Sequence, residues 1–396
     1  MSQAIIVGSG VAGPAVALFL QRAGWNVEVF ESHDEPDPNS GLFLNVATNG
    51  LAVLEQLGLR SALLTDGHAA SRTVMWGSRG QQLGVVPNGP VGDPSRGGVN
   101  VRRGWLQEVL RTGAADAGIR VTYGARLVGI EESAAGVRAV FADGRTADGD
   151  ILVACDGIGS VARAHIDPSA ARPRYTGLVG LGGFAELPGL APTPYEQHMV
   201  SGARSFFGYL VRDNGTIHWF ANVTAPEPAP GTQDSRAPWL EQLRQLHADD
   251  PHPVPQILDA TTGELRAYPI YDLANLRRWS AGRVVLAGDA AHATSPSAGQ
   301  GASLALEDAM TLARCLRDLP THRDAFAAYQ RLRQPRVEKV IRYARSIDSH
   351  KRAPKSRVGI ALRDTVTPIF LSKAATDTRN AWLFDHPIDW DTHVTV

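Results

Sequence analysis

The stretch that decides the fold is Ala4-Ile5-Ile6-Val7-Gly8-Ser9-Gly10-Val11-Ala12-Gly13, near the start of the chain. Its four apolar residues predict a short buried strand, a G-x-G-x-x-G turn follows directly, and apolar residues then recur at helical spacing up to Ala23. Val27–Glu31 predicts a second strand. A strand, a helix and a strand within about 30 residues indicate a βαβ unit, and hence a parallel sheet with a right-handed crossover.

The three glycines of this turn have different tasks in a dinucleotide-binding fold. Gly8 permits the tight turn, Gly10 lets the backbone approach a pyrophosphate, and Gly13 lets helix and strand pack closely. The N–H groups that open the helix attract the phosphates. Glu31 ends the second strand, where a carboxylate accepts hydrogen bonds from the ribose hydroxyls and repels a 2′-phosphate. The stretch therefore predicts a site for FAD or NAD rather than NADP.

A second segment, RVVLAGDAAHATSPSAGQGASLALED at Arg283–Asp308, repeats this arrangement late in the chain. A buried strand at Arg283–Ala287 leads to Asp289, and a Gly-rich loop opens a helix from about Gly301 to Leu316. A dinucleotide needs a second binding segment of this kind only if it is long. FAD fits, because an aspartate can bind its ribityl hydroxyls and the helix N-terminus at Gly299–Gly301 can stabilise the negative charge of reduced flavin.

Three segments together resemble the FAD-dependent aromatic hydroxylases, the single-component flavoprotein monooxygenases of the p-hydroxybenzoate hydroxylase type. They are the Gly-rich turn with Glu31, the DILVACDGIGSVAR segment that contains Asp156-Gly157, and the Gly288-Asp289 segment. A weaker match is VRRGWLQEVL, with Arg103 and Gln107. The resemblance extends over about residues 3–345, in consistent order.

The resemblance implies a role for several residues. Asp289 would hold the ribityl chain, and Pro296 would lie by the flavin near the oxygen-reaction site. Gly299 and Gly301 would offer N–H groups. Asp156, followed by Ser160 and Arg163, would serve FAD packing and NAD(P)H use, or would only buttress the fold. The FAD-binding residues that we expect are Gly8, Gly10, Val11, Ala12, Gly13, Glu31, Arg103, Gln107, Asp156, Asp289, Pro296, Gly299, Gly301 and Ala302.

Four further residues of the second segment have simpler interpretations. Ser303 stands where many relatives have asparagine. His292 is expected to pack the loop after the strand rather than to act in catalysis. Glu307 and Asp308 are expected to cap and pair near the first turns of the helix.

Bulk composition narrows the class of protein. The net charge of −1, with 43% hydrophobic and 20% charged residues, gives no reason to expect nucleic acid or anionic membrane as a partner. No apolar stretch approaches the roughly 20 residues of a membrane helix, and no signal peptide precedes the first strand. Cys155 and Cys315 lack metal-ligand spacing and fit buried positions in a reducing compartment, so we expect a cytoplasmic protein.

The predicted fold class is α/β: a Rossmann-like FAD-binding domain, a mostly antiparallel β-sheet substrate domain and a helical C-terminus. Residues 42–64 predict a helical region within the first part. The predicted domains are 1–171 (FAD-binding, first part), 172–282 (substrate-binding β domain), 283–345 (FAD-binding, second part) and 346–396 (helical region and tail).

The resemblance implies a monooxygenase that hydroxylates an aromatic or polycyclic small molecule with NAD(P)H and O2. NAD(P)H would reduce noncovalently bound FAD, and O2 would form a C4a-hydroperoxyflavin that passes oxygen to an electron-rich carbon. Because the sequence has a single nucleotide fingerprint, we expect NAD(P)H to bind only transiently. No redox-active cysteine pair and no halogenase Gly-Trp-x-Trp-x-Ile-Pro segment occurs. A C=C reductase on the same fold and a flavin-binding protein without turnover remain alternatives. Tailoring of natural products would fit the Ala-, Arg- and Gly-rich composition by family analogy.

The substrate site is predicted from two alternating strands, Ser205–Val211 and Thr216–Val223. Asn214-Gly215 signals a two-residue turn, which would pair Asp213 with Thr216. His218 then becomes a candidate base for a phenol or amine, or else a histidine on the sheet surface. This register places six candidate substrate residues on one face: Phe207, Tyr209, Val211, His218, Phe220 and Asn222. The other face suits core packing: Phe206, Leu210, Ile217, Trp219 and Ala221.

Overall fold

The structure, a computed structural model, describes residues 2–36, 41–90, 96–227, 236–351, 356–374 and 380–395. One half is built on a six-stranded sheet in the order β17-β18-β11-β1-β2-β7, in which only the β17–β18 pair is antiparallel. The bounds are β1 (Gln3–Val7), β2 (Asn26–Phe30), β7 (Arg120–Thr122), β11 (Ile151–Ala154), β17 (Ser280–Ala281) and β18 (Val284–Leu286). The predicted βαβ unit is confirmed, and the late segment at β18 lies only two strands from β1.

Helices cover this sheet and form one apolar core with it. The first helix, α1 (Ala12–Arg22), has Pro14 in its first turn and ends before Gly24, whose φ is +87°. It packs against α9 (Gly301–Asp318), which also contacts α2 (Thr48–Gln56) and α10 (His322–Lys351). Further helices are α3 (Arg60–Leu64), α4 (Arg103–Asp116), α5 (Val161–Ile166), α8 (Asp289–His292), the 3-10 helix η1 (Pro296–Ala298) and α12 (Ala381–Phe384). None of the helices described is both long and apolar enough to span a membrane.

The other half is built on a nine-stranded sheet, in the order β16-β12-β15-β14-β13-β4-β6-β3 with β5 paired to β4. All pairs are antiparallel except β13–β4, as predicted for a mostly antiparallel domain. The bounds are β3 (Phe43–Val46), β4 (His68–Trp76), β5 (Gln82–Pro87), β6 (Gly98–Arg102), β12 (Arg174–Glu186), β13 (Tyr195–Ser201), β14 (Phe206–Val211), β15 (Thr216–Thr224) and β16 (Thr261–Asp272). The sheet thus takes strands from both sides of the predicted boundary near residue 171, and the domain limits stay a prediction.

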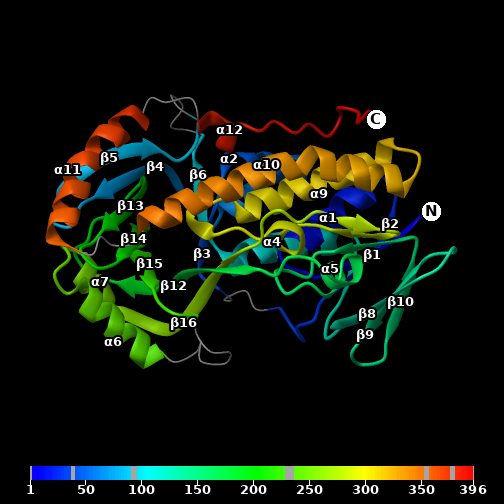
Figure 1. Ribbon diagram of the computed structural model, residues 1–396, viewed down its shortest axis with the longest axis horizontal. Coiled ribbons are helices and arrows are strands. Elements are labelled where there is room, and N and C mark those ends of the chain that lie inside the picture. Colours follow the sequence, from blue (N-terminus) through cyan, green and yellow to red (C-terminus); the bar gives the residue numbers. More distant parts are fainter. Residues whose placement is uncertain are drawn as a thin grey trace.

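Three further groups of elements complete the molecule. A separate antiparallel sheet contains β8 (Leu127–Glu132), β9 (Val137–Phe141) and β10 (Thr146–Gly149). Two helices, α6 (Arg236–His247) and α7 (Val254–Asp259), pack on the nine-stranded sheet in a second apolar core, and α11 (Arg357–Ala374) contacts β5. In Figure 1, α10 runs along the molecule from the six-stranded half to the nine-stranded sheet, so it contacts both halves.

The prediction of a helical region at residues 42–64 is wrong at its start, where β3 pairs with β6. Phe43 faces Arg102 and Val46 faces Val99 across this pair, over 50 residues apart in the chain. A partner so distant overrides the local helical preference. The consequence is functional, because β3 is the edge strand of the nine-stranded sheet and contacts α9, so side chains of this segment lie next to that helix.

The predicted two-residue turn between β14 and β15 is also wrong. The N–H of Arg212 donates to the carbonyl of Thr216, and the N–H of Gly215 donates to the carbonyl of Arg212, each at 2.9 Å. The loop therefore has three residues, with Gly215 in the left-handed region at φ +84°. Such a loop is a type I turn followed by a glycine bulge, another conformation that Asn-Gly favours. It pairs Val211 with Ile217 instead of with His218.

This one-residue shift divides the six candidate substrate residues between two faces, because side chains alternate along a strand. His218, Phe220 and Asn222 lie opposite Leu210, Gly208 and Phe206 and share their face. The other three, Phe207, Tyr209 and Val211, share the face of Ile217, Trp219 and Ala221 in the second core. The prediction that all six share a face is thus wrong.

Candidate active site

The Gly-rich turn between β1 and α1 requires two of its glycines for packing within the protein itself. A Cβ at Gly8 would overlap the carbonyl oxygen of Cys155, and one at Gly13 would overlap the carbonyl oxygen of Gly8. Gly10 differs, since its Cβ would come no closer than 3.9 Å to a protein atom, Nε2 of Gln107 on α4. The space before Gly10 is therefore a recess that a side chain would fill, and it suits a pyrophosphate.

Glu31 follows β2 directly beside this turn. Its Oε2 accepts a hydrogen bond from the N–H of Ser9 at 2.6 Å, and its Oε1 accepts one from the N–H of His33 at 2.9 Å. Burial raises the pKa of Glu31, but these backbone hydrogen bonds and the side chain of His33 together outweigh burial and leave the pKa below its usual value. An ionised carboxylate is thus fixed at the rim of the recess, as an adenosine ribose would require.

The second FAD-binding segment, at Gly288-Asp289, adjoins the Gly-rich turn. A Cβ at Gly288 would lie 3.0 Å from the Cβ of Ala12 at the start of α1. The next residue, Asp289, has an exposed side chain and begins α8. The surrounding protein desolvates the carboxyl group and raises the pKa of Asp289, and the charges of His292 and Arg103 offset this rise only in part. The fold therefore brings together the two predicted FAD-binding segments and Arg103, the first residue of α4.

The loop before α9 forms the far end of the same site. Pro296 begins the 3-10 helix η1, and Gly299 follows it in the left-handed region at φ +61°. Gly301 and Ala302 are the first two residues of α9, so their N–H groups lie at its N-terminal end. Next to Gly299 lies Asn45 of β3, whose Nδ2 would be 3.3 Å from a Cβ at that glycine. Asn45 was not among the predicted site residues, because β3 was not predicted.

Comparison with known proteins matches residues 1–344 of the chain to the FAD-binding domain family. The chain belongs to this family. It is 32% identical to the aurachin C monooxygenase/isomerase of Stigmatella aurantiaca over 84% of this chain and 85% of that protein. It is 30% identical to the 6-hydroxynicotinate 3-monooxygenase of Pseudomonas fluorescens over 85% and 89% of the two chains. The crystal structure of Klebsiella pneumoniae HpxO with FAD and uric acid superposes with a TM-score of 0.84, at 25% identity, covering 96% of this chain and 97% of that one.

The chain is therefore an FAD-dependent monooxygenase, as the resemblance implied, and its cofactor is FAD. The recess at Gly10, the ionised Glu31 and the open carboxylate of Asp289 fit this cofactor. The individual contacts expected for the FAD-binding residues stay predictions. Their placement is consistent, because these residues lie on the turn into α1 and its first residues, directly after β2, on α4, between β11 and α5, or between the start of α8 and the start of α9.

Asp156 lies between β11 and α5, where it supports the fold. Its Oδ2 accepts hydrogen bonds from the N–H groups of Val161 and Ala162 at 2.8 and 3.3 Å, and so caps α5. Arg163 on α5 donates to the carbonyl of Ala290 at 3.0 Å, which ties α5 to the helix that carries Asp289. Through these contacts Asp156 and Arg163 support the second FAD-binding segment. A direct contact of Asp156 with FAD stays a prediction.

Glu307 and Asp308 pair with cations, as predicted, but they do so in a buried ion-pair network with α10 and do not cap α9. Arg333 of α10 donates to Asp308 at 2.7 Å and to Glu307 at 2.5 Å, and Arg336 donates to Glu307 at 2.7 Å. His292 hydrogen-bonds Asp308 and so packs α8 against α9, in agreement with its predicted structural role. Despite burial, the arginines and His292 hold the pKa values of Glu307 and Asp308 at about 2.

The face of β15 that carries His218 and Phe220 packs against Phe43 of β3, the strand that contacts α9. The ring of Phe43 on β3 lies 5.5 Å from that of His218 and 5.9 Å from that of Phe220. Two residues further along β3, Asn45 lies beside Gly299, so this aromatic cluster adjoins the loop that carries Pro296. Of the candidate substrate residues, the structure therefore places His218, Phe220 and Asn222 on the side of the cofactor loop.

His218 has properties that its sequence position did not suggest. It is 2% exposed, and burial lowers its pKa to about 3, far below the neutral value on which the role of a base depended. Its Nδ1 has no hydrogen-bond partner among the residues described. A neutral imidazole with a free nitrogen suits hydrogen bonding to a ligand better than storage of a proton.

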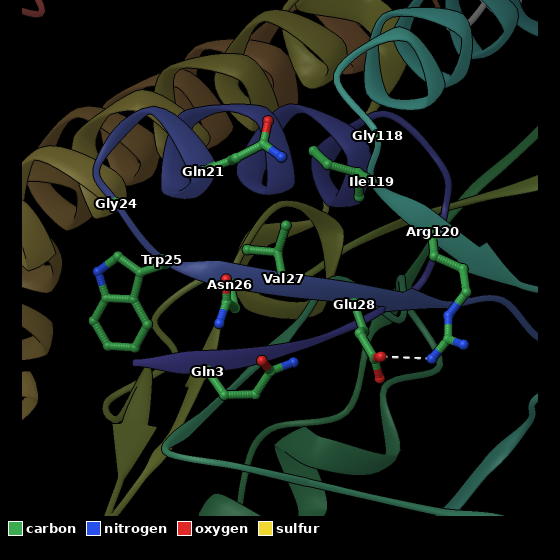
Figure 2. A pocket seen from close by; sticks show the side chains of 10 residues that line it. All are labelled: Gln3, Gln21, Gly24, Trp25, Asn26, Val27, Glu28, Gly118, Ile119 and Arg120. Atoms are coloured by element: carbon green, nitrogen blue, oxygen red, sulfur yellow. Dashed lines mark hydrogen bonds and ion pairs between the residues drawn. The ribbon is translucent and has the colours of Figure 1, made fainter. Parts of the chain in front are cut away.

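Two hollows of the surface lie away from this site. One, of about 510 Å³, lies at the amino ends of β1 and β2 and includes Gln21, Trp25 and the ion pair between Glu28 and Arg120 (Figure 2). Ligands of parallel sheets bind at the carboxyl ends of the strands, so this hollow is not the cofactor site. The other, of about 370 Å³, contains Tyr209 on the opposite face of the nine-stranded sheet.

Proposed function

We propose that the enzyme uses NADH or NADPH and O2 to hydroxylate an electron-rich aromatic ring, held on the face of β15 that carries His218 and Phe220. The observation that carries the proposal is the aromatic cluster of Phe43, His218 and Phe220 beside the loop of Pro296 and Gly299. The name of one relative, 6-hydroxynicotinate 3-monooxygenase, supports the proposal, because 6-hydroxynicotinate is an aromatic acid. A cytoplasmic location fits the proposal, because NAD(P)H is supplied there.

FAD, when bound, would supply the redox chemistry, which is the acceptance of hydride from NAD(P)H and the activation of O2. The protein's own groups would hold it through Glu31 at the ribose, Asp289 at the ribityl chain and the N–H groups at the start of α9. These N–H groups favour negative charge next to the helix end. Only one dinucleotide fingerprint exists, so NAD(P)H would visit without a Rossmann domain of its own.

The remaining residues would orient the substrate and exclude water. The rings of Phe43, Phe184 and Phe220 surround or adjoin His218, with Phe184 at 4.9 Å, and present apolar area to an aromatic ring. Nδ1 of His218 would accept or donate one hydrogen bond to a ring substituent. A dry site matters, because water lets activated oxygen escape as hydrogen peroxide.

The proposal is tested with purified, FAD-loaded enzyme and a panel of phenols, aromatic acids and polycyclic compounds. Substrate-dependent consumption of both NAD(P)H and O2, with one atom of ¹⁸O from ¹⁸O2 in the product, is the expected result. Consumption of NAD(P)H alone, with a saturated product, would identify a C=C reductase. Consumption of neither would identify a flavin-binding protein without turnover.

Truncating the aromatic cluster should uncouple the reaction. Phe220→Ala and His218→Ala should raise several-fold the fraction of NAD(P)H oxidation in which O2 is reduced to hydrogen peroxide without product formation, while FAD stays bound, because a misplaced ring leaves the site wet. Peroxide and product are measured together for each variant. Tyr209→Phe is the matched control, since the Tyr209 hydroxyl bonds His198 at 2.9 Å on the opposite face. Equal uncoupling in the control, or normal coupling in both alanine variants, contradicts the assignment of this face.

A further inference from the structure

The last residue of α10, Lys351, lies against the same face of the nine-stranded sheet. Its Nζ donates to Oδ1 of Asn222 at 2.9 Å. The same ammonium lies 4.8 Å from the ring centroid of Phe206 and 5.4 Å from that of Phe220, within the range of cation–π attraction. Helix α10 therefore inserts a cation into the aromatic cluster of the proposed substrate site.

The positive charge of Lys351 is not neutralised by a salt bridge within the described parts of the chain. The acid that acts on it is Asp348, one turn earlier on α10, whose Oδ1 accepts from the hydroxyls of Ser295 and Ser297 at 2.8 and 2.5 Å. Burial lowers the pKa of Lys351 to about 8, with only partial compensation from Asp348. An ammonium taken out of water without a carboxylate is costly, and an anionic ligand would offset that cost.

The partner of the ammonium also matters. An amide oxygen such as that of Asn222 fixes the position of the ammonium but carries no net charge, so the full positive charge stays available. Along β15, His218 lies four residues from Asn222, about 13 Å for an extended strand, with Phe220 between them. The face thus offers a cation at one end, an aromatic ring in the middle and a free imidazole nitrogen at the other end.

We propose that Lys351 is a specificity-determining residue that binds an oxyanion carried by the aromatic substrate, either a carboxylate or an ionised ring hydroxyl. This inference rests on the proposed function of the same face. Asp348 binds two serines of the loop around η1, which we place beside the flavin, and Lys351 would bind the substrate. One end of α10 would therefore position the substrate relative to the cofactor loop.

The test measures the affinity of FAD-loaded protein at pH 7.5 by the change in flavin absorbance, for two pairs of probes. Salicylate is compared with neutral salicylamide, and 4-nitrophenolate with neutral 4-nitroanisole. Wild-type protein should bind at least one anion about tenfold or more tightly than its neutral partner, the worth of a hydrogen bond to a charged group. The pair that shows this preference identifies a carboxylate or a ring oxyanion as the ligand.

Lys351→Met should abolish the preference for the anion and leave the affinity of the neutral partner within about twofold. Lys351→Arg keeps the charge and should keep a preference, which guards against a variant that folds poorly. Lys339→Met is the matched control, because Lys339 lies on the same helix but stacks on Trp382 at 3.9 Å. A preference that survives in Lys351→Met, or wild-type protein that prefers neither anion, overturns the inference. Failure of ¹⁸O incorporation with the preference intact would contradict only the proposed function.

Discussion

Replacing Arg333 with methionine is expected to lower the free energy of unfolding by about 3–5 kcal/mol, the usual cost of removing one partner of a buried ion pair. Arg333 is 1% exposed and donates to both Asp308 and Glu307, neither of which is accessible to solvent. Without its guanidinium, Asp308 keeps only His292 as a side-chain partner in the described network, and Glu307 keeps Asn49 and Arg336. Two buried carboxylates are then left poorly compensated.

Urea unfolding at pH 7, followed by circular dichroism, measures this effect. Arg342→Met is the matched control on the same helix, because Arg342 is 66% exposed and reaches Glu338 only at 3.9 Å. An exposed pair of this kind contributes at most about 1 kcal/mol. If the two variants lose equal stability, the network does not hold α9 to α10 as we infer.

The same network gives a pH dependence of known sign. Glu307 and Asp308 have pKa values of about 2 in the folded protein, below their ordinary values near 4. Groups with depressed folded-state pKa values contribute stability that is fully present above about pH 4 and is lost as the pH falls toward 2. Wild-type protein should therefore lose more stability than Arg333→Met over this interval.

Local motifs carried most of what the sequence predicted about the cofactor half. The tasks of Gly8 and Gly13 follow from their spacing alone, and the structure shows the close backbone contacts that require them. The partners of Glu307 and Asp308 could not be predicted, because Arg333 and Arg336 follow 25 or more residues later on another helix. Nothing in a polar helix distinguishes a buried arginine from an exposed one before the packing is known.

The substrate side depended on finer details that local sequence does not determine. Asn214-Gly215 is compatible with a two-residue and a three-residue loop, and the difference of one residue moves half of the candidate side chains to the opposite face. Phe43 was missed because β3 forms only in contact with the distant strand β6. Lys351 was missed because its neighbours Asn222 and Phe206 come from a sheet over 120 residues earlier.

Two alanine substitutions in the Gly-rich turn should separate the packing role of a glycine from its role toward FAD. Gly13→Ala places a Cβ on the carbonyl oxygen of Gly8, so the apoprotein should lose about 1–3 kcal/mol or more of stability as α1 is pushed from β1. Gly10→Ala meets its nearest protein atom only at 3.9 Å, so the apoprotein should unfold within about 0.5 kcal/mol of wild type. Its methyl group would instead occupy the recess in which the pyrophosphate must approach the backbone, and FAD affinity should fall by about 10- to 100-fold.

Both quantities are measured on deflavinated protein, stability by urea unfolding and affinity by titration with FAD. Gly129→Ala on β8 is the control, because its Cβ would make only an ordinary contact of 3.7 Å with Val140, away from both FAD-binding segments. It should change neither stability nor FAD affinity appreciably. Wild-type FAD affinity in Gly10→Ala would mean that the recess is not where the pyrophosphate binds. A loss of apoprotein stability equal to that of Gly13→Ala would mean that Gly10 serves packing alone, because the protein would then fail without any ligand present.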